Sequence, residues 1–468
     1  MIRRFLMDND GSNFFQGTMT EDIQASIAEA VWECPANVTT YLLCSGAGTY
    51  YYPTKVGDVV PNAPLLHAAH KKGLDPFGMF LEALKRAGKE TFITYRMNDV
   101  HNPTEDWNLP RVRREHPDCI VDIGAVEANR AEWMSYCMDY SRPEVREYVL
   151  ATFRELVELY DVDGIQLDWM RFPRHLSGSP EQVWEKRHFL TEFTSQVRSI
   201  IRRSGKRILL TARVPTSAAG RRHVGLDVAE WTRQGLVDFL VIHPFLTTDF
   251  VIPLQELRLE LGSYPVPIYA GFDFGHGLQN HCPESLRAAA LSLYDCGADG
   301  IYVFNFPCWQ EHLAARPYHW LAGIEHPSTA ARKPLLFSIS CQHHRVPNVD
   351  LPGELPKPLP AGGGLTLSIH VPRLALPAAR ALFLVHSCGD IALRVNGSQV
   401  LELPTLRRSE LFAEYIDPER SKDYRPRRDD CRVFQAAPSL LRAGANELVL
   451  VNRSVKDLEI KRVNLGLW

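Results

Sequence analysis

The sequence predicts a (β/α)8 TIM barrel followed by a smaller C-terminal β-sandwich of the jelly-roll type. Strand-like and helix-like segments alternate eight times through residues 1–325, which is typical of a closed parallel sheet covered by helices. After residue 335 the chain changes to short strand-like runs separated by turn residues. An open, doubly wound sheet is the less favoured alternative, because no GxGxxG or P-loop motif follows the first strand.

The expected barrel strands are short apolar runs, as expected of strands that are buried on both faces. In chain order they are RRFLM at 3–7, VTTYLLC at 38–44, TFITYRM at 91–97, GIQL at 164–167, RILLTARV at 207–214, VDFLVIHPF at 237–245, VPIYAGFDFG at 266–275 and DGIYVFNF at 299–306.

The helices between these strands are predicted from apolar residues that recur three and four positions apart. Ser141, followed by Pro143 and Glu144, is typical of a capped helix start. The expected helices begin at Thr20, Asp75, Pro143, Ser179, Asp227, Leu254 and Pro283, and a last one covers residues 309–324.

The second domain is predicted from a change in composition. Residues 326–334 form the expected linker between a barrel at 1–325 and a sandwich at 335–468. Asn396-Gly397 stands between two alternating runs and predicts a tight β-hairpin. The VNG and LLRAGANELVLVN stretches resemble the galactose-binding-like modules that accompany many carbohydrate-active enzymes. Such a module either binds sugar or supports the barrel, and we expect support.

Composition excludes several kinds of partner. A net charge of −3 gives no polybasic surface for nucleic acid, and no apolar run approaches a membrane span. The ten cysteines form no CxxC pair, and we expect neither a metal nor an organic cofactor.

The start, MIRRFLMDNDGSNF, lacks the apolar segment of a signal peptide. The chain as written is therefore expected in the cytoplasm, although a signal removed earlier would leave the same start. Its oligomeric state is left open.

Polar side chains collect at the predicted C-terminal ends of the barrel strands, where barrel enzymes carry their active sites. This contrast with the apolar strand bodies favours a ligand with many hydroxyl groups or a charge. The candidate residues are Asp8, Asp10, Tyr95, Arg96, Asn98, Asp99, His101, Asp168, Trp169, Arg171, Arg213, His243, Asp273 and Asn305.

Glycoside hydrolysis is the chemistry that fits such a set, because it needs two carboxyl groups beside the scissile bond. One carboxylate attacks or positions water, and the other group donates a proton to the leaving oxygen. Asp168 is the candidate for the first role, kept ionised by Arg171 or by Arg213 on the fifth strand. Asp273 is preferred as the proton donor, with Asp99 as the alternative.

Four stretches together resemble the barrels described as family 10-type glycosyl hydrolases, in the wider amylase-like group. They are DGIQLDWMRFP at 163–173, DYSRPEVREYV at 139–149, GLDVAEWTRQGLVDFLV at 225–241 and GADGIYVFNF at 297–306. The resemblance implies a glycoside hydrolase with Asp168 as nucleophile and Arg171 beside it. Two residues depart from related barrels: Gln166 replaces the usual histidine or arginine, and Arg213 stands where true amylases carry a glutamate.

Two other functions remain open at this point. A non-catalytic carbohydrate-binding barrel is suggested by the missing acid on the fifth strand. A metal-assisted hydrolase would use Asp8, Asp10, His101 or His243. The arginines at 96, 171 and 213 also suggest an anionic sugar, because guanidinium groups pair well with carboxylate and sulfate.

Overall fold

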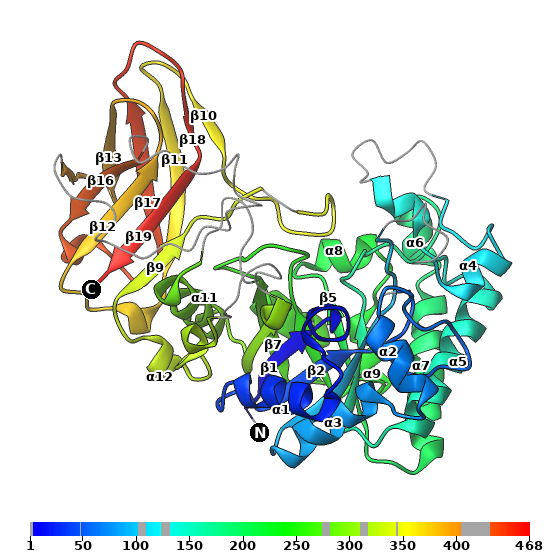
Figure 1. Cartoon of the computed structure of the whole chain (residues 1–468). Coiled ribbons are helices and arrows are strands. Elements are labelled where there is room, and N and C mark those ends of the chain that lie inside the picture. The colour runs from blue at the N-terminus through cyan, green and yellow to red at the C-terminus, as the bar shows by residue number, and fades with distance from the viewer. Residues whose placement is uncertain are drawn as a thin grey trace.

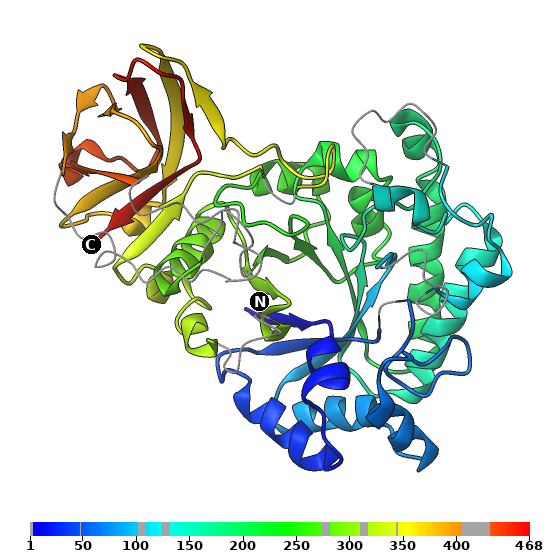
Figure 2. The same ribbon diagram turned by 45° about the horizontal axis from the view of Figure 1, so that its top comes forward.

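The computed structural model describes residues 3–46, 48–101, 109–122, 132–273, 281–308, 317–342, 345–403 and 431–468. Its N-terminal part is a closed barrel whose strands follow one another in chain order, and every neighbouring pair is parallel (Figures 1 and 2). The predicted barrel is therefore confirmed. Its strands are β1 (Phe5–Asn9), β2 (Thr40–Cys44), β3 (Glu90–Arg96), β4 (Gly164–Asp168), β5 (Leu209–Val214), β6 (Phe239–Ile242), β7 (Ile268–Asp273) and β8 (Gly300–Phe304).

The first strand is displaced from its predicted position at 3–7. Strand β1 begins at Phe5, because the preceding Arg4 is an ion-pairing residue at the opposite end of the barrel from the strand ends considered above. The Arg4 guanidinium contacts Glu90 at 2.7 Å and donates to the Tyr269 hydroxyl at 3.2 Å. As a result, Asp8 lies inside the strand and not in the loop that follows it.

Helices surround the barrel (Figure 2) and mostly begin close to their predicted starts. They are α1 (Ile23–Glu33), α2 (Pro64–Lys71), α3 (Pro76–Arg86), α4 (Arg111–Glu115), α5 (Pro143–Leu159), α6 (Pro180–Glu185), α7 (His188–Ser204), α8 (Ala218–His223), α9 (Val228–Arg233), α10 (Leu254–Leu261), α11 (Pro283–Asp295) and α12 (Pro327–Ala330). Asp75 and Asp227 cap α3 and α9 through their carboxylates. Ser141, in contrast, does not cap α5, whose N-cap residue is Arg142.

Other predictions on helices were also wrong. Helix α2 lies within a segment expected to be a loop. The helix expected over 309–324 is not α-helical in its described part, where residues 317–324 contain only the 3-10 turn η5 (Tyr318–Leu321). Residues 309–316 lie outside the described part of the chain.

The barrel interior is apolar in its lower layers and polar at its C-terminal end. Side chains alternate between the two faces of each strand. Those that fill the lower interior are Leu6, Leu42, Phe92, Phe239, Val241, Tyr269, Tyr302 and Phe304, all almost completely buried. The intervening residues face the helices and belong to the main hydrophobic core. The charged side chains described below lie above this apolar floor.

The C-terminal part is an antiparallel β-sandwich (Figure 1). A five-stranded sheet has the order β15-β16-β12-β19-β9, a four-stranded sheet has the order β11-β17-β13-β14, and β10 pairs with β18. The strands are β9 (Leu335–Ser338), β10 (Lys357–Leu359), β11 (Gly364–Val371), β12 (Ala381–His386), β13 (Ile391–Val395), β14 (Ser398–Gln399), β15 (Leu401–Glu402), β16 (Cys431–Ala436), β17 (Gly444–Asn452), β18 (Leu458–Ile460) and β19 (Arg462–Leu467).

The predicted hairpin is confirmed. Val395 pairs with Ser398, so Asn396 and Gly397 form a two-residue turn. Both have positive φ, at 48° and 83°, as a type I′ turn requires.

The sandwich meets the barrel at two places. Strand β9 lies along helix α11, and Phe337 of β9 packs its ring edge-on against Phe250, which follows β6 in the barrel part. Farther along, Arg345 forms a buried pair with Asp249. The domain boundaries at 325 and 335 stay predictions, and the short helix α12 lies within the predicted linker. Among the described helices, none combines the length and the apolar character that crossing a bilayer demands.

Candidate active site

Three of the predicted residues lie side by side at the C-terminal end of the barrel. Arg96, Asp168 and Arg213 are in direct register on β3, β4 and β5. Their side chains point into the barrel because they alternate with interior residues one layer below, where Thr94 donates to Gln166 at 3.1 Å. All three are buried, at 7%, 2% and 0% exposure. The strand alternation thus builds a charged layer above the apolar floor.

Asp168 is held by three donors. Its Oδ2 accepts a hydrogen bond from Nη1 of Arg213 at 2.9 Å. Its Oδ1 accepts the backbone N–H groups of Met170 at 3.0 Å and of Arg171 at 3.1 Å. The positive partner of Asp168 is therefore the guanidinium of the fifth strand, whereas Arg171 contributes its backbone. This arrangement fixes the position and orientation of the carboxylate.

Arg213 links Asp168 to His243. Its Nη2 donates to Nδ1 of His243 at 3.0 Å, and its guanidinium lies 3.9 Å from the ring centre of Phe304. Burial and the neighbouring Arg213 charge lower the pKa of His243 well below its usual value. The imidazole is therefore neutral and carries its proton on Nε2, because Nδ1 accepts from the arginine.

Asp8 is the second buried carboxyl group of this layer. It is 2% exposed, and its Oδ2 makes no hydrogen bond within the described residues. Burial and the negative charge of Asp168 raise the pKa of Asp8 to about 7, against the opposing effect of Arg213 and Arg96. Asp8 is thus a carboxyl group that still holds its proton near neutral pH, next to one that is bound to an arginine.

A separate ion-pair network lies beside this pair. Arg96 donates to Asp99 Oδ2 at 2.9 Å and to Asp10 Oδ2 at 3.1 Å. His101 donates from Nδ1 to Asp99 Oδ1 at 2.6 Å and accepts from Arg171 Nη2 at 2.6 Å. Burial opposes the ionisation of Asp99, but His101 and Arg96 outweigh it and hold the pKa of Asp99 below its ordinary value. Asp99 is therefore a poor proton donor at neutral pH.

Asp10 joins this network to the end of β8. Its Oδ2 accepts from Nδ2 of Asn305 at 3.0 Å, and its Oδ1 accepts from the Ser12 hydroxyl at 2.7 Å. Although burial raises the pKa of Asp10, Arg96 and hydrogen bonds from Cys308 and Ser12 lower it to about 2. Asn305 has a φ of 50°, a left-handed conformation that asparagine adopts more readily than most residues.

Three predicted binding residues do not face the barrel mouth. Tyr95 lies on the outer face of β3, where its hydroxyl is 3.2 Å from that of Tyr50. Trp169 is completely buried and packs against aromatic rings on the helix side, including that of Trp231. Asn98 ties loops together, since its Nδ2 donates to the carbonyl of Arg174 at 2.7 Å. Tyr95 directly precedes the inward-facing Arg96, and Trp169 directly follows the inward-facing Asp168. Because side chains alternate along a strand, both point away from the barrel interior, toward the helices.

Asp273, the preferred proton donor in the sequence, ends β7 and is completely buried. Its position alternates with Tyr269 of the barrel interior, so it belongs to the inward-facing set. It pairs in register with Phe304 of β8. Its backbone carbonyl accepts from the Thr248 hydroxyl at 3.0 Å. Its catalytic role stays a prediction.

Sequence reasoning missed an aromatic wall at the mouth. Phe172, Phe245 and Trp133 pack together, with Trp133 stacked on Phe245 at 6.1 Å and edge-on to Phe172 at 5.3 Å. The Arg171 guanidinium lies over both phenylalanine rings. Phe172 has a φ of 53°, a strained conformation for a bulky residue of the kind that clusters at functional sites. No sequence pattern reveals this φ, but Phe172 lies within the motif that carries the resemblance.

The four residues proposed for metal-assisted hydrolysis are divided between different partners. Asp10 belongs to the Arg96 network, and His243 accepts from Arg213. Within the described ranges, no three histidine, cysteine, aspartate or glutamate residues are placed to hold a metal ion together.

The fold and the mouth together define a TIM-barrel protein with a buried layer of charged side chains at the C-terminal ends of its barrel strands. No protein-family model matches the chain. A stretch of 115 residues is 28% identical to the 1,4-alpha-glucan branching enzyme GlgB of Nocardia farcinica, covering 24% of this chain and 14% of that enzyme. GlgB of Mycobacterium ulcerans is 24% identical over 158 residues, which is 31% of this chain and 20% of the enzyme. The chain therefore matches a fifth or less of the length of these two relatives.

Among solved structures, the chain is similar to the glycoside hydrolase domain of PgaB (BpsB) from Bordetella bronchiseptica, with 11% identity and a TM-score of 0.47 over 69% of this chain and 99% of that one. It is also similar to the noncanonic maltogenic alpha-amylase AmyB from Thermotoga neapolitana, with 12% identity and a TM-score of 0.40 over 98% of this chain and 99% of that one.

Proposed function

We propose that this chain is a glycoside hydrolase in which Asp168 and Asp8 are the two catalytic carboxyl groups. The observation that carries the proposal is their contrast in environment. Asp168 is bound to a fully buried guanidinium and two backbone N–H groups, whereas burial and the Asp168 charge keep Asp8 protonated up to a pKa of about 7. Two carboxyl groups in different environments, one of which keeps its proton near neutral pH, are the arrangement that this reaction uses.

In the proposed reaction, Asp8 donates its proton to the glycosidic oxygen as the bond to the anomeric carbon breaks. The negative charge of Asp168 stabilises the positive charge that develops on the sugar, by direct attack or by positioning water. Water supplies the hydroxyl group that ends on the anomeric carbon, and its remaining proton returns to the carboxyl pair. Atoms and charges balance without a cofactor.

Asp8 replaces the donors that the sequence suggested. Asp99 is disfavoured because its carboxylate is bound to Arg96 and His101. Asp273 stays the second candidate, since it occupies an inward-facing position at the end of β7. Comparing the activities of Asp8→Asn and Asp273→Asn distinguishes the two candidates. A substrate with a good leaving group needs no proton donor, so it restores activity only in the variant that lacks the true donor.

The substrate we propose is an uncharged glycan. Of the three arginines that suggested an anionic sugar, Arg171 donates to His101, whereas Arg96 and Arg213 each bind carboxylates of the protein itself. Their charge is thus largely compensated before any ligand arrives. The similarity to 1,4-alpha-glucan branching enzymes supports a glucan as the first substrate to test.

The test is the release of new reducing ends from neutral, uronic and sulfated glycans. We expect wild-type activity on a neutral glycan, and a loss of about 10²- to 10⁴-fold in Asp168→Asn and in Asp8→Asn with the fold intact. Asp161→Asn is the matched control, because Asp161 is exposed and pairs with Lys85 on the surface. Activity of Asp168→Asn within a few-fold of the control would contradict the proposal.

A carbohydrate-binding barrel without catalysis is the second candidate. It is favoured by one observation, namely that Arg213, near the end of β5, stands where an amylase-type barrel would carry an acid. Binding of a neutral glycan with no turnover, in both the wild type and Asp168→Asn, would support this function. Glycan transfer products in place of free reducing ends would instead indicate a transferase that uses the same carboxyl pair.

A further inference from the structure

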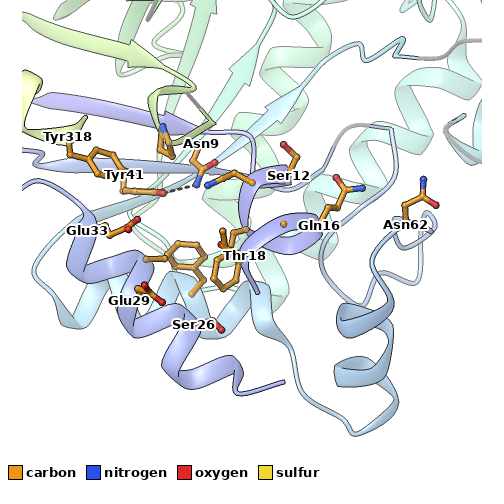
Figure 3. A pocket seen from close by; sticks show the side chains of 16 residues that line it. Asn9, Ser12, Gln16, Thr18, Ser26, Glu29, Glu33, Tyr41, Asn62 and Tyr318 are labelled. Carbon is orange, nitrogen blue, oxygen red and sulfur yellow. Dashed lines mark hydrogen bonds between the residues drawn. The ribbon is translucent and has the colours of Figure 1, made fainter. Parts of the chain in front are cut away.

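A cavity of about 890 Å³ lies outside the barrel, next to its C-terminal mouth. Figure 3 shows it between helix α1 and the segment that runs from Asn9 through the π-helix η1 (Asn13–Thr18). Tyr41 of β2, Phe80 of α3 and Tyr318 are among the residues that line it. Its size is in the range of small-molecule sites, roughly 300–1,000 Å³.

The lining has the chemistry of a site for hydroxyl groups. Aromatic rings from Phe14, Phe80 and Tyr41 provide apolar surface, and the remaining side chains are mostly amides and hydroxyls. Glu29 and Glu33, one helical turn apart on α1, add two carboxylates, and none of the described lining residues is a lysine or arginine. Carboxylates and amides accept hydrogen bonds from sugar hydroxyls, and the carboxylates repel anionic ligands. The polar lining side chains are Asn9, Ser12, Asn13, Gln16, Thr18, Ser26, Glu29, Glu33 and Asn62.

The cavity and the mouth share one wall. Asn9 lines the cavity and donates from Nδ2 to the Tyr41 hydroxyl at 2.8 Å. Asp10, the next residue, belongs to the mouth through Arg96. Ser12 lines the cavity while its hydroxyl donates to Asp10. A ligand in the cavity is thus separated from the mouth network by one tight turn of chain.

Trp32 lies on the same helix as Glu29 and Glu33, just outside the set of residues that line the cavity. It is 84% exposed on α1, three residues after Glu29 and therefore next to it on the helix surface. An indole face left in water at such a position is suited to packing against the apolar face of a sugar ring.

We propose that this cavity, with Trp32 at its edge, is an accessory site that binds a non-anionic sugar unit, either neutral or amine-bearing. The inference rests on the proposed function for its choice of carbohydrate. It adds a second place at which the glycan is held, beside the carboxyl pair and outside the barrel axis. Uronic and sulfated units are repelled by the Glu29 carboxylate.

The test uses heptamers of α-1,4-linked glucose, β-1,4-linked glucosamine and galacturonate in titration calorimetry. The protein carries Asp168→Asn so that the probes stay uncut. Thr18→Trp fills the cavity from an exposed rim position of η1. We expect the glucose or glucosamine heptamer to bind at least about tenfold more weakly after this change, and the galacturonate heptamer to be unaffected.

Three further variants keep the test decisive if Thr18→Trp does not fold. Trp32→Ala should weaken the same heptamer, while Leu259→Ala should not, because Leu259 is a matched exposed residue, 82% accessible on α10 and outside the cavity. Glu29→Gln should weaken only the glucosamine heptamer. Unchanged binding in both Thr18→Trp and Trp32→Ala, or no binding of any probe, would overturn the accessory site. Turnover by the wild type is measured separately, so failure of the hydrolase proposal is seen independently.

Discussion

Asp8 and Asp168 illustrate how one barrel mouth gives two aspartates different properties. Both are almost completely buried, so desolvation acts against the charge of each. Asp168 is compensated by a guanidinium and two backbone donors, whereas Asp8 faces the charge of Asp168 with one oxygen free of hydrogen bonds among the described residues. The proposed division of labour follows from this difference.

The raised pKa of Asp8 predicts a stability cost at neutral pH. Its folded pKa of about 7 exceeds the ordinary value of 3.8, so the unfolded chain loses this proton at lower pH than the folded chain does. The free energy of unfolding therefore falls as pH rises, until the folded pKa is passed. Asp8→Asn cannot ionise and removes this fall. As the pH rises from 5 to 8, we expect the free energy of unfolding of the variant to increase by about 3 kcal/mol relative to that of the wild type, measured by urea unfolding. Parallel pH curves for the two proteins would contradict it.

Arg213 is expected to be irreplaceable by lysine. Its guanidinium reaches Asp168 and His243 at once, and an ammonium group cannot make both contacts in the same geometry. Arg213→Lys should lower kcat/KM by at least about tenfold. The matched control is Arg198→Lys, which alters a buried pair with Asp238 just before β6, at the other end of the barrel. Equal losses of activity in the two variants would show that Arg213 acts only through stability.

Residue positions were predictable where a local pattern exists. Asp168 follows an apolar strand in a specific motif, and its place at the end of β4 follows from that pattern. Tyr95 and Trp169 were misplaced although the two-residue period of a strand puts them opposite Arg96 and Asp168. The partner of Asp168 could not be predicted, because it lies on another strand, 45 residues away in the sequence.

At the scale of elements, the end of β6 depends on a segment that follows the first sandwich strand. Asp350 accepts the backbone N–H of Phe245 at 3.0 Å with one oxygen and that of Val346 at 2.8 Å with the other. Phe245 in turn forms part of the aromatic wall with Trp133 and Phe172. A segment distant in sequence thus positions one side of the mouth.

Loss of this contact should affect substrate binding more than chemistry. Asp350→Ala leaves two buried N–H groups without their acceptor, at a cost of roughly 1–3 kcal/mol for each such group. We expect KM for the glycan to rise several-fold with kcat little changed, and Asp350→Asn, which keeps one acceptor oxygen, to recover part of the loss. A fall in kcat with unchanged KM would instead indicate that the segment around Asp350 acts on Asp8 and Asp168.

The barrel strands were predictable as elements because each is a compact apolar run. Helix α2 was not, since it is short, begins at Pro64 and carries few core residues. The position of Phe245 in the wall was likewise hidden, because its backbone is fixed by Asp350, 105 residues later.

For the whole molecule, the contact between barrel and sandwich is apolar and buried. Phe337 is completely buried and meets Phe250 of the barrel part. Phe337→Ala should destabilise the protein by about 3–5 kcal/mol and separate the unfolding of the two parts in calorimetry. Phe383→Ala, a buried residue of the central sandwich strand β12, is the comparison that should weaken the sandwich alone. A single unchanged transition in Phe337→Ala would contradict a supporting role for the sandwich.

The periodicity of the apolar residues largely predicts the overall architecture, because a chain of eight strand and helix pairs permits few closed arrangements. The way the sandwich docks was not, since it depends on buried contacts such as that of Arg345 with Asp249. Similarly, the cavity beside α1 is assembled from seven separate segments and has no continuous signature in the sequence.

The most direct test of the central claim is the pH dependence of kcat/KM on a neutral glycan, measured for the wild type and for Asp8→Asn. A proton donor with a pKa of about 7 is active below that pH and loses activity above it. We predict that the wild-type kcat/KM falls tenfold per pH unit above about pH 7. We expect Asp8→Asn to be at least about 100-fold slower at pH 6 and to lack this fall above pH 7. A variant that follows the wild-type profile would contradict it.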